Sequence, residues 1–357
     1  MIPISKPSLG VEEKEAVSRV LEKGYLAQGK EVERFEQEWA SYIGTKFAVA
    51  TNSGTSALHI ALACLGIGNG DKVITTPFSF IASASSIVMQ RATPIFCDID
   101  PRTYNLNPQQ IEDRIDERTR AIVTVHLYGQ PCDMGPVLAI AQKHNLHVIE
   151  DACQAHGAEY RGRKVGSIGD IGVFSFYPTK NMTTGEGGII TTNDKGVSEK
   201  ARKLRDHGQG QRYEHEILGY NYRMTNIAAA IGLVQLKKLE QFNGKRIKNA
   251  AYYNQNLNTK IQKPSEIDKV RHVFHQYTIR VKDRKPFINY LEDKGIGYGI
   301  YYPIPIHKQP LFREYNSLNL PQAQEASEQV VSLPVHPALN REELEYVAEV
   351  VNSYEGW

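Results

Sequence analysis

Long apolar runs are missing from this sequence. No window approaches the ~18 apolar residues that a membrane-spanning helix requires. The start, MIPISKPSLGVEEKEAV, has no basic segment leading into an apolar stretch. These absences argue against a membrane protein and against an export signal, so we expect a cytoplasmic protein with no membrane partner.

Cysteine is scarce, and neither sign of charge is in excess. The four cysteines lie far apart without a Cys-x-x-Cys pair, which argues against a zinc site or a disulfide framework. We therefore expect small buried side chains and no metal site. The 42 Lys and Arg nearly cancel the 40 Asp and Glu, leaving a formal charge of +2. This balance argues against a nucleic-acid partner.

Short β-branched runs alternate with helix-length segments from about residue 47 to residue 192. The runs are KFAVAT, KVITTP, TPIFCDI, RAIVTV, LHVIED, IGVFSF and GGIITT. This βα alternation predicts an α/β fold, with a mainly parallel sheet flanked by helices on both faces. Two amphipathic helices are predicted before it, in VEEKEAVSRVLEKG and GKEVERFEQEWASYIG. We predict a large domain over residues 1–245.

The remaining residues, 246–357, predict a smaller C-terminal α+β domain. HVFHQYTIRV has the composition of a strand, whereas KPFINYLEDKG and REELEYVAEVVNSY have the patterns of helices. The boundary near residue 245 falls close to a helical segment that begins in TNIAAAIGLVQLKKLEQF. No internal repeat is present.

Three motifs at strand ends carry chemistry. In ATNSGTSALHIAL, a strand leads through Ser53-Gly54-Thr55-Ser56 into a helix, a pattern typical of an anion site and equally of an ordinary N-cap. In HVIEDACQAHG, a strand ends in a carboxylate, Asp151, which can reach a ligand or simply cap a helix. In IGVFSFYPTKNMTTGEGG, Ser175 ends a strand and Lys180 lies in the following loop.

Together these motifs supply the parts of a pyridoxal phosphate (PLP) enzyme. The cofactor needs a phosphate anchor, an acidic partner for its pyridine nitrogen and an amine that forms a Schiff base. A free lysine, with a pKa of about 10.4, is protonated at neutral pH and must lose that proton to act as nucleophile or base. We therefore expect Lys180 to be buried and Asp151 to be ionised.

The chain resembles the DegT/DnrJ/EryC1/StrS family of sugar aminotransferases over essentially its full length. The segments NSGTSALHIAL, VHLYGQPCDM, IEDACQAHGAEY, FSFYPTKNMTTGEGG, GYNYRMTNIAAA and YYPIPIHKQP carry this resemblance, in order and at the family's spacing. It implies the aspartate-aminotransferase fold (fold type I), with a seven-stranded sheet in the large PLP domain. It further implies that Lys180 is the catalytic residue and forms the internal aldimine with PLP.

The resemblance assigns roles to the matching residues. The implied cofactor-binding residues are Gly54, Thr55, Phe80, Asp151, Gln154, Ser175, Lys180 and Asn221. Among these, Asn221 is expected to reach the partner's phosphate across a homodimer interface, so that the two subunits share their active sites. His307, Tyr177 and Glu186 are expected to bind substrate, and His126 and His156 to lie near the site. We also expect His307, Lys308 and Gln309 to offer hydrogen-bond donors to a diphosphate or a sugar hydroxyl.

The implied activity is the transfer of an amino group from glutamate or glutamine to a 3-keto or 4-keto nucleotide-diphosphate sugar. Such a reaction belongs to amino-sugar biosynthesis for cell-surface glycans, polysaccharides or glycosylated metabolites. Three alternatives are a PLP-dependent sugar dehydratase, a regulatory protein without turnover, and an aminotransferase of small amino acids. The last would use an arginine to grip a carboxylate, for which Arg223, Arg271 and Arg280 are available.

Overall fold

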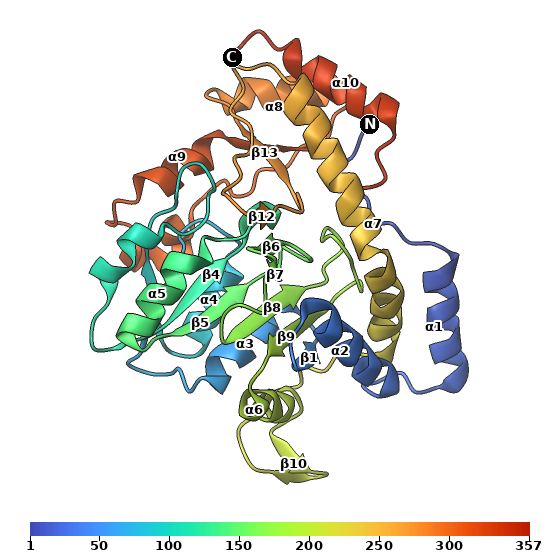
Figure 1. Cartoon of the computed structure of the whole chain (residues 1–357), viewed down its shortest axis with the longest axis vertical. Helices are drawn as coiled ribbons and strands as arrows, with labels where there is room; N and C mark the ends of the chain where they lie inside the picture. Colours follow the sequence, from blue (N-terminus) through green and yellow to red (C-terminus); the bar gives the residue numbers. More distant parts are fainter.

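A seven-stranded sheet lies at the centre of the computed structural model, which describes residues 1–357 (Figure 1). Its strands, in spatial order, are β1 (Phe47–Thr51), β9 (Gly188–Thr192), β8 (Ile171–Ser175), β5 (His147–Asp151), β4 (Thr119–Val125), β2 (Lys72–Thr75) and β3 (Thr93–Phe96). Strand β9 is antiparallel to both neighbours, and every other pair is parallel. The prediction of a mainly parallel sheet is confirmed, and six strands end at the same edge.

Helices cover both faces of this sheet. One face packs against α3 (Gly54–Cys64), α4 (Ala82–Met89) and α6 (Lys195–Arg205). The other packs against α2 (Lys30–Ile43), α5 (Met134–His144) and α7 (Asn226–Asn256).

Alternation along the strands assigns each side chain to a face, because successive residues of a strand point to opposite sides. In β5, Val148 packs toward α5 and Ile149 toward α3. In β8, Val173 packs toward α3 and Phe174 toward α2 and α7. These apolar runs are therefore buried on both faces, as the continuous hydrophobic strands of a covered parallel sheet are.

The C-terminal part has its own hydrophobic core. It contains α8 (Arg284–Asp293), α9 (Pro321–Gln329), α10 (Arg341–Asn352) and the antiparallel pair of β13 (Tyr277–Arg280) and β14 (Val330–Leu333). Its core includes Ala250 and Tyr253 from the end of α7, so this helix runs from the sheet into the C-terminal part (Figure 1). The domain boundary at residue 245 thus falls inside one helix, and the division stays a prediction.

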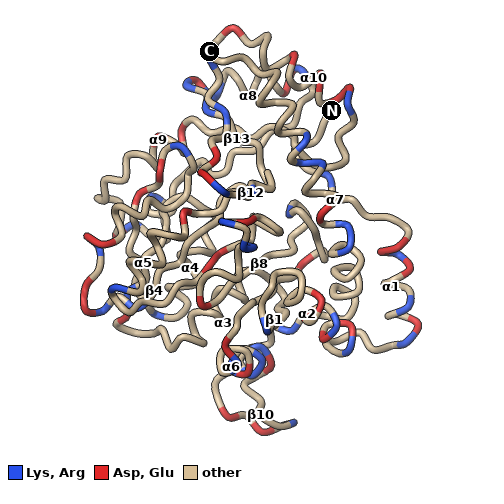
Figure 2. Tube along the Cα trace, viewed as in Figure 1, with Lys and Arg blue, Asp and Glu red and all other residues tan.

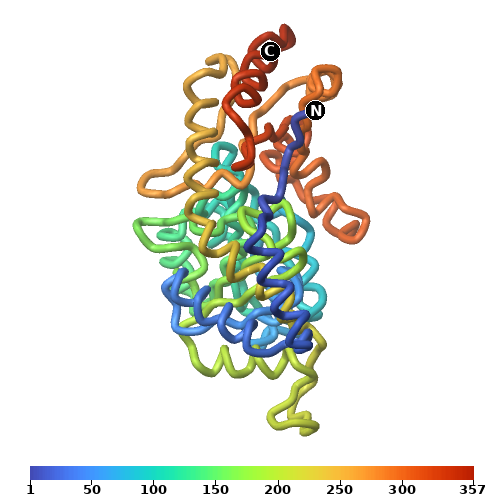
Figure 3. Tube along the Cα trace, turned by 90° about the vertical axis from the view of Figure 1, so that its right-hand side faces the viewer, coloured from blue at the N-terminus to red at the C-terminus, as the bar shows by residue number.

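Shorter elements complete the chain. The strands are β6 (Glu159–Tyr160), β7 (Arg163–Lys164), β10 (Gln209–Gln211), β11 (Glu214–His215) and β12 (Val270–Arg271). The 3₁₀ turns are η1 (Pro108–Gln110), η2 (Glu112–Arg114), η3 (Leu127–Gly129), η4 (Ile306–Lys308) and η5 (Pro310–Tyr315). The hairpin of β10 and β11 projects from the end of the molecule opposite to the two termini (Figures 1 and 3).

The N-terminal segment joins both parts of the molecule. Ile2 pairs with Ile296 in the C-terminal part, and the chain then runs to α1 (Val11–Lys23), which packs beside α7 (Figure 3). Basic and acidic residues are interspersed along α1 and α6 (Figure 2). No helix is both long enough and apolar enough to cross a membrane. No group of three or more His, Cys, Asp or Glu is arranged to hold a metal ion.

The strand predicted in HVFHQYTIRV, residues 272–281, is wrong over its first half, because β13 begins only at Tyr277. The preceding backbone bonds to the turn η3 instead. The N–H of Val273 donates to the carbonyl of Gly129 at 3.0 Å, and the N–H of Gln276 donates to that of Tyr128 at 3.2 Å. These contacts bring His275 and Gln276 to the edge of the large sheet.

Candidate active site

A cavity of about 680 Å³ lies at the carboxyl ends of the parallel strands. Both parts of the chain line it, because Tyr301 and Tyr302 of the C-terminal part face the strand ends of the large sheet. The predicted residues that line it are Gly54, Thr55, Phe80, Asp151, Gln154, Ser175, Tyr177, Lys180 and Glu186. The fold thus brings together all the predicted site residues except Asn221 and His307.

The start of α3 forms one end of this cavity. Ser53 caps the helix, since its hydroxyl accepts a hydrogen bond from the N–H of Ser56 at 3.1 Å. The N–H groups of Gly54 and Thr55 come before any intrahelical acceptor, so they remain available to a ligand. A Cβ on Gly54 would lie 2.8 Å from the Cβ of Ser175, closer than real contacts allow. The absence of a side chain at Gly54 therefore keeps this corner open.

Asp151 ends β5 and is almost completely buried. The hydroxyl of Ser83 donates to its Oδ2 at 2.7 Å, and the N–H of Cys153 donates to its Oδ1 at 3.2 Å. Because burial removes most of the water that would solvate the carboxylate, these donors stabilise its negative charge. Asp151 thus presents a charged acceptor to the cavity.

Lys180 lies in the loop between β8 and β9. Burial lowers the pKa of Lys180 below its usual value of 10.5, whereas the negative charge of Asp151 acts in the opposite direction. The next residue fixes the loop, because the Asn181 amide donates to Asn243 of α7 at 2.8 Å. A lowered pKa favours the neutral amine, which is the form that acts as a nucleophile or base.

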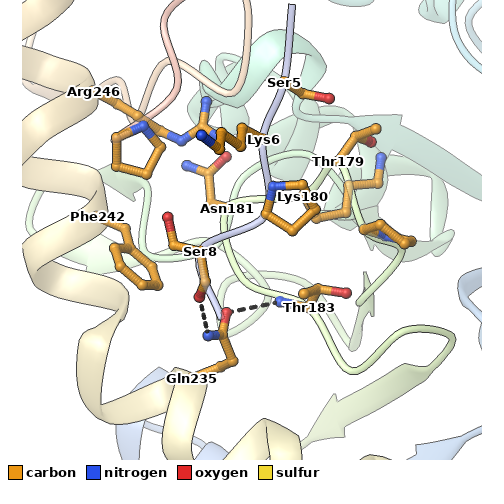
Figure 4. A pocket seen from close by; sticks show the side chains of 13 residues that line it. Ser5, Lys6, Ser8, Thr179, Lys180, Asn181, Thr183, Gln235, Phe242 and Arg246 are labelled. Carbon is orange, nitrogen blue, oxygen red and sulfur yellow. Dashed lines mark hydrogen bonds between the residues drawn. The ribbon is translucent and has the colours of Figure 1, made fainter. Parts of the chain in front are cut away.

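A small pocket of about 10 Å³ lies on the other side of the Lys180 loop, beneath the N-terminal segment (Figure 4). Gln235 of α7 connects the two segments. Its amide donates to the carbonyl of Ser8 at 2.8 Å, and its side-chain oxygen accepts from the N–H of Thr183 at 3.4 Å (Figure 4). The N-terminal segment therefore supports the loop that carries Lys180.

Gln154 lies between the two parts of the chain. Its oxygen accepts from the N–H of Tyr128 at 3.0 Å, and its amide donates to the hydroxyl of Tyr302 at 3.0 Å. The Tyr128 hydroxyl in turn donates to the carbonyl of Tyr301. These bonds dock the Tyr301-Tyr302 segment on the ends of β4 and β5.

Three of the predicted residues lie on the exposed side of the cavity. Phe80 is 55% exposed and Tyr177 is 48% exposed, although both are large aromatic side chains. Glu186 is also exposed. Exposed aromatic groups at the wall of a cavity are available to stack on a ligand.

Two predicted residues lie outside the cavity. Asn221 is exposed beside the projecting hairpin and pairs through its backbone with Asp206. His307 is completely buried, with its ring 6.4 Å from that of Phe96. Lys308 donates to the carbonyl of Asn316. None of the three expected donors, His307, Lys308 and Gln309, lines the cavity, and the substrate-binding role of His307 stays a prediction.

His126 and His156 lie beneath the site and do not line the cavity. His126 accepts from the N–H of Cys132 at its Nδ1, so its Nε2 carries the proton and donates to Glu150 at 3.0 Å. His156 bonds through Nε2 to the carbonyl of Ser175 at 2.7 Å. Burial, followed by the charge of Lys180, lowers the pKa of His156 to about 3. Both imidazoles therefore serve as supports for neighbouring strand ends.

Sequence reasoning missed several lining residues, namely Ser79, Ser83, Cys153, His275, Gln276, Tyr301 and Tyr302. The spacing of Ser79 and Ser83, four residues apart, is that of neighbours on one side of a helix, although α4 begins only at Ala82 and Ser79 precedes it. The others had no local signal, because their approach to the site depends on contacts between distant segments.

The family model described as "DegT/DnrJ/EryC1/StrS aminotransferase family" matches residues 7–352. The chain belongs to this aminotransferase family. One relative is the dTDP-3-amino-3,6-dideoxy-alpha-D-galactopyranose transaminase of Aneurinibacillus thermoaerophilus, which is 44% identical over 96% of this chain and 95% of that protein. The family prediction made from the sequence is confirmed.

Solved structures of family relatives share the fold. S. venezuelae DesV, solved in complex with a ketimine intermediate, is 39% identical over 96% of this chain and 93% of that chain, with a TM-score of 0.93. The putative sugar aminotransferase Spr1654 from Streptococcus pneumoniae, solved in its PLP form, is 28% identical over 99% of this chain and 98% of that chain, with a TM-score of 0.94. The fold-class prediction is therefore confirmed as well.

Proposed function

We propose that this aminotransferase uses PLP to move an amino group from glutamate or glutamine to a keto sugar carried on a nucleoside diphosphate, in amino-sugar biosynthesis. The observation that carries the proposal is the cavity in which Lys180, Asp151 and the start of α3 face one space. The relative from Aneurinibacillus thermoaerophilus is by name a transaminase of a dTDP-linked amino sugar, which supports the substrate class.

The residues of the cavity fit PLP. Gly54, Thr55 and Ser175 would hold the phosphate, because helix N–H groups and hydroxyls suit an anion and no Cβ at Gly54 obstructs it. Asp151 would accept a hydrogen bond from the protonated pyridine nitrogen, and Gln154 would approach the ring hydroxyl. Phe80, whose side chain is 55% exposed at the cavity wall, would cover one face of the ring.

PLP supplies an aldehyde that binds amino groups and a ring that accepts electrons when a neighbouring C–H bond breaks. Lys180 then moves the proton. Once the donor's amino group has displaced it from the cofactor, the Lys180 amine would remove the proton from Cα of the donor and pass it to the cofactor. In the second half-reaction it would take a proton back from the cofactor and give it to the sugar carbon that receives nitrogen. General acid–base catalysis of this kind contributes roughly 10²- to 10⁴-fold to a rate. Burial of Lys180 favours the neutral amine that this proton transfer requires.

The positions of the arginines favour a sugar over a small amino acid as acceptor. None of Arg223, Arg271 and Arg280 lines the cavity. Each has a partner elsewhere: Arg223 binds Asp206, Arg271 binds Glu240 at 2.7 Å, and Arg280 lies 3.5 Å from Glu325. An amino-acid aminotransferase that grips both substrates by an arginine would need such a side chain in the pocket.

The other two alternatives are less well supported. The family resemblance implies that a sugar dehydratase would carry a histidine in place of this lysine, and position 180 is a lysine. A regulatory protein without turnover has no need of a lysine whose pKa is lowered by burial beside a carboxylate.

A homodimer with shared sites is part of the proposal. Asn221 is exposed outside the cavity, Tyr213 in the turn of the nearby hairpin is 77% exposed, and Leu218, which follows the hairpin, is 83% exposed. Large apolar side chains exposed to solvent are available to an interaction surface. A two-fold dimer would place each subunit's Asn221 at the partner's phosphate.

The cofactor assignment is tested by reduction with borohydride, which attaches bound PLP to its lysine. We expect the purified protein to be yellow and the labelled peptide to contain Lys180. Lys180→Ala should lose the colour and the activity, whereas Lys195→Ala, a change on an exposed lysine, should keep both. A label on another lysine, or full turnover by Lys180→Ala, would contradict the assignment.

The substrate class is tested on the pyridoxamine form of the enzyme. A panel of 3-keto and 4-keto nucleotide sugars should restore the visible absorbance of the lysine-bound cofactor, with the amino sugar detected by mass spectrometry. The keto product of the donor should restore it too, which is 2-oxoglutarate for glutamate and 2-oxoglutaramate for glutamine. Return of colour with pyruvate or oxaloacetate, and with no keto nucleotide sugar, would move the function to amino-acid metabolism.

A further inference from the structure

The Asp151 carboxylate is held by the hydroxyl of Ser83, which is bonded in turn to the hydroxyl of Ser79. The proposed mechanism uses neither hydroxyl. Ser83 Oγ lies 2.7 Å from Asp151 Oδ2, and Ser79 Oγ lies 2.7 Å from Ser83 Oγ. All three side chains are almost completely buried, with exposed fractions of 5% or less. A chain of three polar side chains thus runs from the start of α4 to the end of β5.

Each serine hydroxyl has only one proton to donate, and this fixes the direction in which the hydrogen bonds run. An ionised carboxylate only accepts, so the single proton of Ser83 points to Asp151. Ser79 can donate either to Ser83 or to the carbonyl of Phe80, which lies 3.0 Å away. If it chose the carbonyl, the two hydroxyl oxygens would face each other at 2.7 Å without a proton between them. Ser79 therefore donates to Ser83, and Ser83 donates to Asp151.

Two hydrogen bonds within the chain leave part of the acceptor capacity of Asp151 free, and Asp151 lines the cavity. Ser83 occupies one acceptor site on Oδ2 and the N–H of Cys153 occupies one on Oδ1. A carboxylate has about four lone-pair sites, so acceptor capacity remains on the side of the cavity. Hydrogen bonds in a buried chain polarise one another, which strengthens the last bond to the carboxylate.

We propose that Ser83, supported by Ser79, is a positioning residue that aims Asp151 at the pyridine nitrogen of the cofactor. The proposal rests on the proposed function, since it needs PLP in the cavity. Ser83 itself does not bind the cofactor nitrogen. Its hydroxyl fixes the plane of the carboxylate and stabilises its charge, so that a protonated ring nitrogen meets a prepared acceptor.

The experiment compares two cofactors on the full-length apoprotein. PLP has a ring nitrogen that Asp151 can bind, whereas deazaPLP has a C–H in its place and the same phosphate, aldehyde and hydroxyl. Affinity for each is measured by fluorescence titration. Ser83→Ala should weaken PLP binding about tenfold, the effect of losing one charge-assisted hydrogen bond. It should leave deazaPLP binding unchanged, because that ring makes no such bond.

Matched variants separate positioning from packing. Ser86→Ala removes another buried hydroxyl of α4, one that has no hydrogen-bond partner, and should bind both cofactors like the wild type. Ser83→Cys keeps the shape but donates weakly, so it should resemble Ser83→Ala and serves if the alanine variant fails to fold. Equal loss of PLP and deazaPLP affinity in the Ser83 variants, or no loss of either, would overturn the proposal.

The role of Ser79 is tested by a double-mutant cycle. Ser79→Ala alone should weaken PLP binding by a smaller factor than Ser83→Ala. In the Ser83→Ala background it should have no further effect, because its hydroxyl acts only through Ser83. Additive losses of affinity would show that Ser79 acts on its own. They would contradict a series of hydrogen bonds that runs from Ser79 through Ser83 to Asp151.

The outcomes also distinguish this inference from the proposed function. If the wild type binds PLP on Lys180 and Ser83→Ala behaves like the wild type, only the positioning role fails. If the wild type binds neither cofactor, the proposed function fails and the positioning role fails with it.

Discussion

The side-chain amide of Gln154 donates to the hydroxyl of Tyr302 at 3.0 Å, although the two residues are separated by 148 positions in the chain. Gln154 follows β5 of the large sheet, whereas Tyr302 belongs to the C-terminal part. The bond lies at the wall of the cavity, because both residues line it. The two parts of the chain therefore meet through a specific polar contact at the candidate active site.

Tyr302→Phe should lower the free energy of unfolding by about 1 kcal/mol, because it leaves the buried amide of Gln154 with an unpaired N–H. Urea unfolding at one fixed protein concentration measures the change. Tyr301→Phe is the control, since the Tyr301 hydroxyl makes no hydrogen bond within the chain and only its carbonyl accepts one, from Tyr128. Equal effects of the two substitutions would contradict the contact as a source of stability.

Gly54→Ala should weaken the binding of PLP about tenfold or more. The new Cβ would lie 2.8 Å from the Cβ of Ser175 and 3.1 Å from the sulfur of Cys153, so the start of α3 must move away from the anion site. Gly244→Ala is the matched control, because a Cβ there meets nothing within 4 Å inside helix α7. Equilibrium dialysis with PLP measures the affinity of each variant. Unchanged affinity in Gly54→Ala would argue against a phosphate at this turn.

Mixtures of Lys180→Ala and Asn221→Ala chains should regain activity. In a mixed dimer, one site would have both residues intact and the other would have neither, if Asn221 reaches the partner's site. Random reassortment makes about half of the dimers mixed, each with one intact site, so about one quarter of wild-type activity is expected. Native mass spectrometry confirms the mixed dimers. Their presence without recovered activity would count against shared sites.

Glu150→Gln should destabilise the fold by about 3 kcal/mol near neutral pH. The buried carboxylate accepts from His126 and from the N–H groups of Gly166, Ile168 and Gly169, at distances from 2.7 to 3.0 Å. A glutamine would turn an N–H₂ group toward some of these donors. Glu199→Gln, on an exposed glutamate of α6, is the control and should change little.

The effect of Glu150→Gln should depend on pH in a defined direction. Burial alone raises the pKa of Glu150, but the hydrogen bonds from His126 and from the backbone outweigh it and hold the pKa below its usual value of 4.5. The stability that the carboxylate contributes is complete above pH 4.5 and is lost as pH falls through the lowered pKa. The difference between wild type and variant should therefore shrink in acid. Urea unfolding across a pH series measures this difference. A difference that stays constant down to low pH would contradict this account.

The order of the elements was predictable because its signals are local. Apolar runs such as LHVIED and IGVFSF form strands buried on both faces, and their continuous hydrophobicity needs no knowledge of partners. The start of α3 was also readable from Ser53 and Gly54, since capping acts within one turn. The strand prediction failed over residues 272–276 because contacts with a distant segment decided their conformation. These residues have strand composition, but their backbone groups found acceptors in the turn η3.

The sequence by itself determined the fold class, the family and the residues that end the central strands, because periodicity and motif spacing are properties of neighbouring residues. Only the tertiary structure decided what surrounds those residues. It brought Ser83 within hydrogen-bond distance of Asp151, and Tyr302 within hydrogen-bond distance of Gln154. It also buried His307 against Phe96 instead of exposing it to the cavity. Contacts of this kind join segments far apart in the chain, and their geometry depends on how helices and sheet pack together.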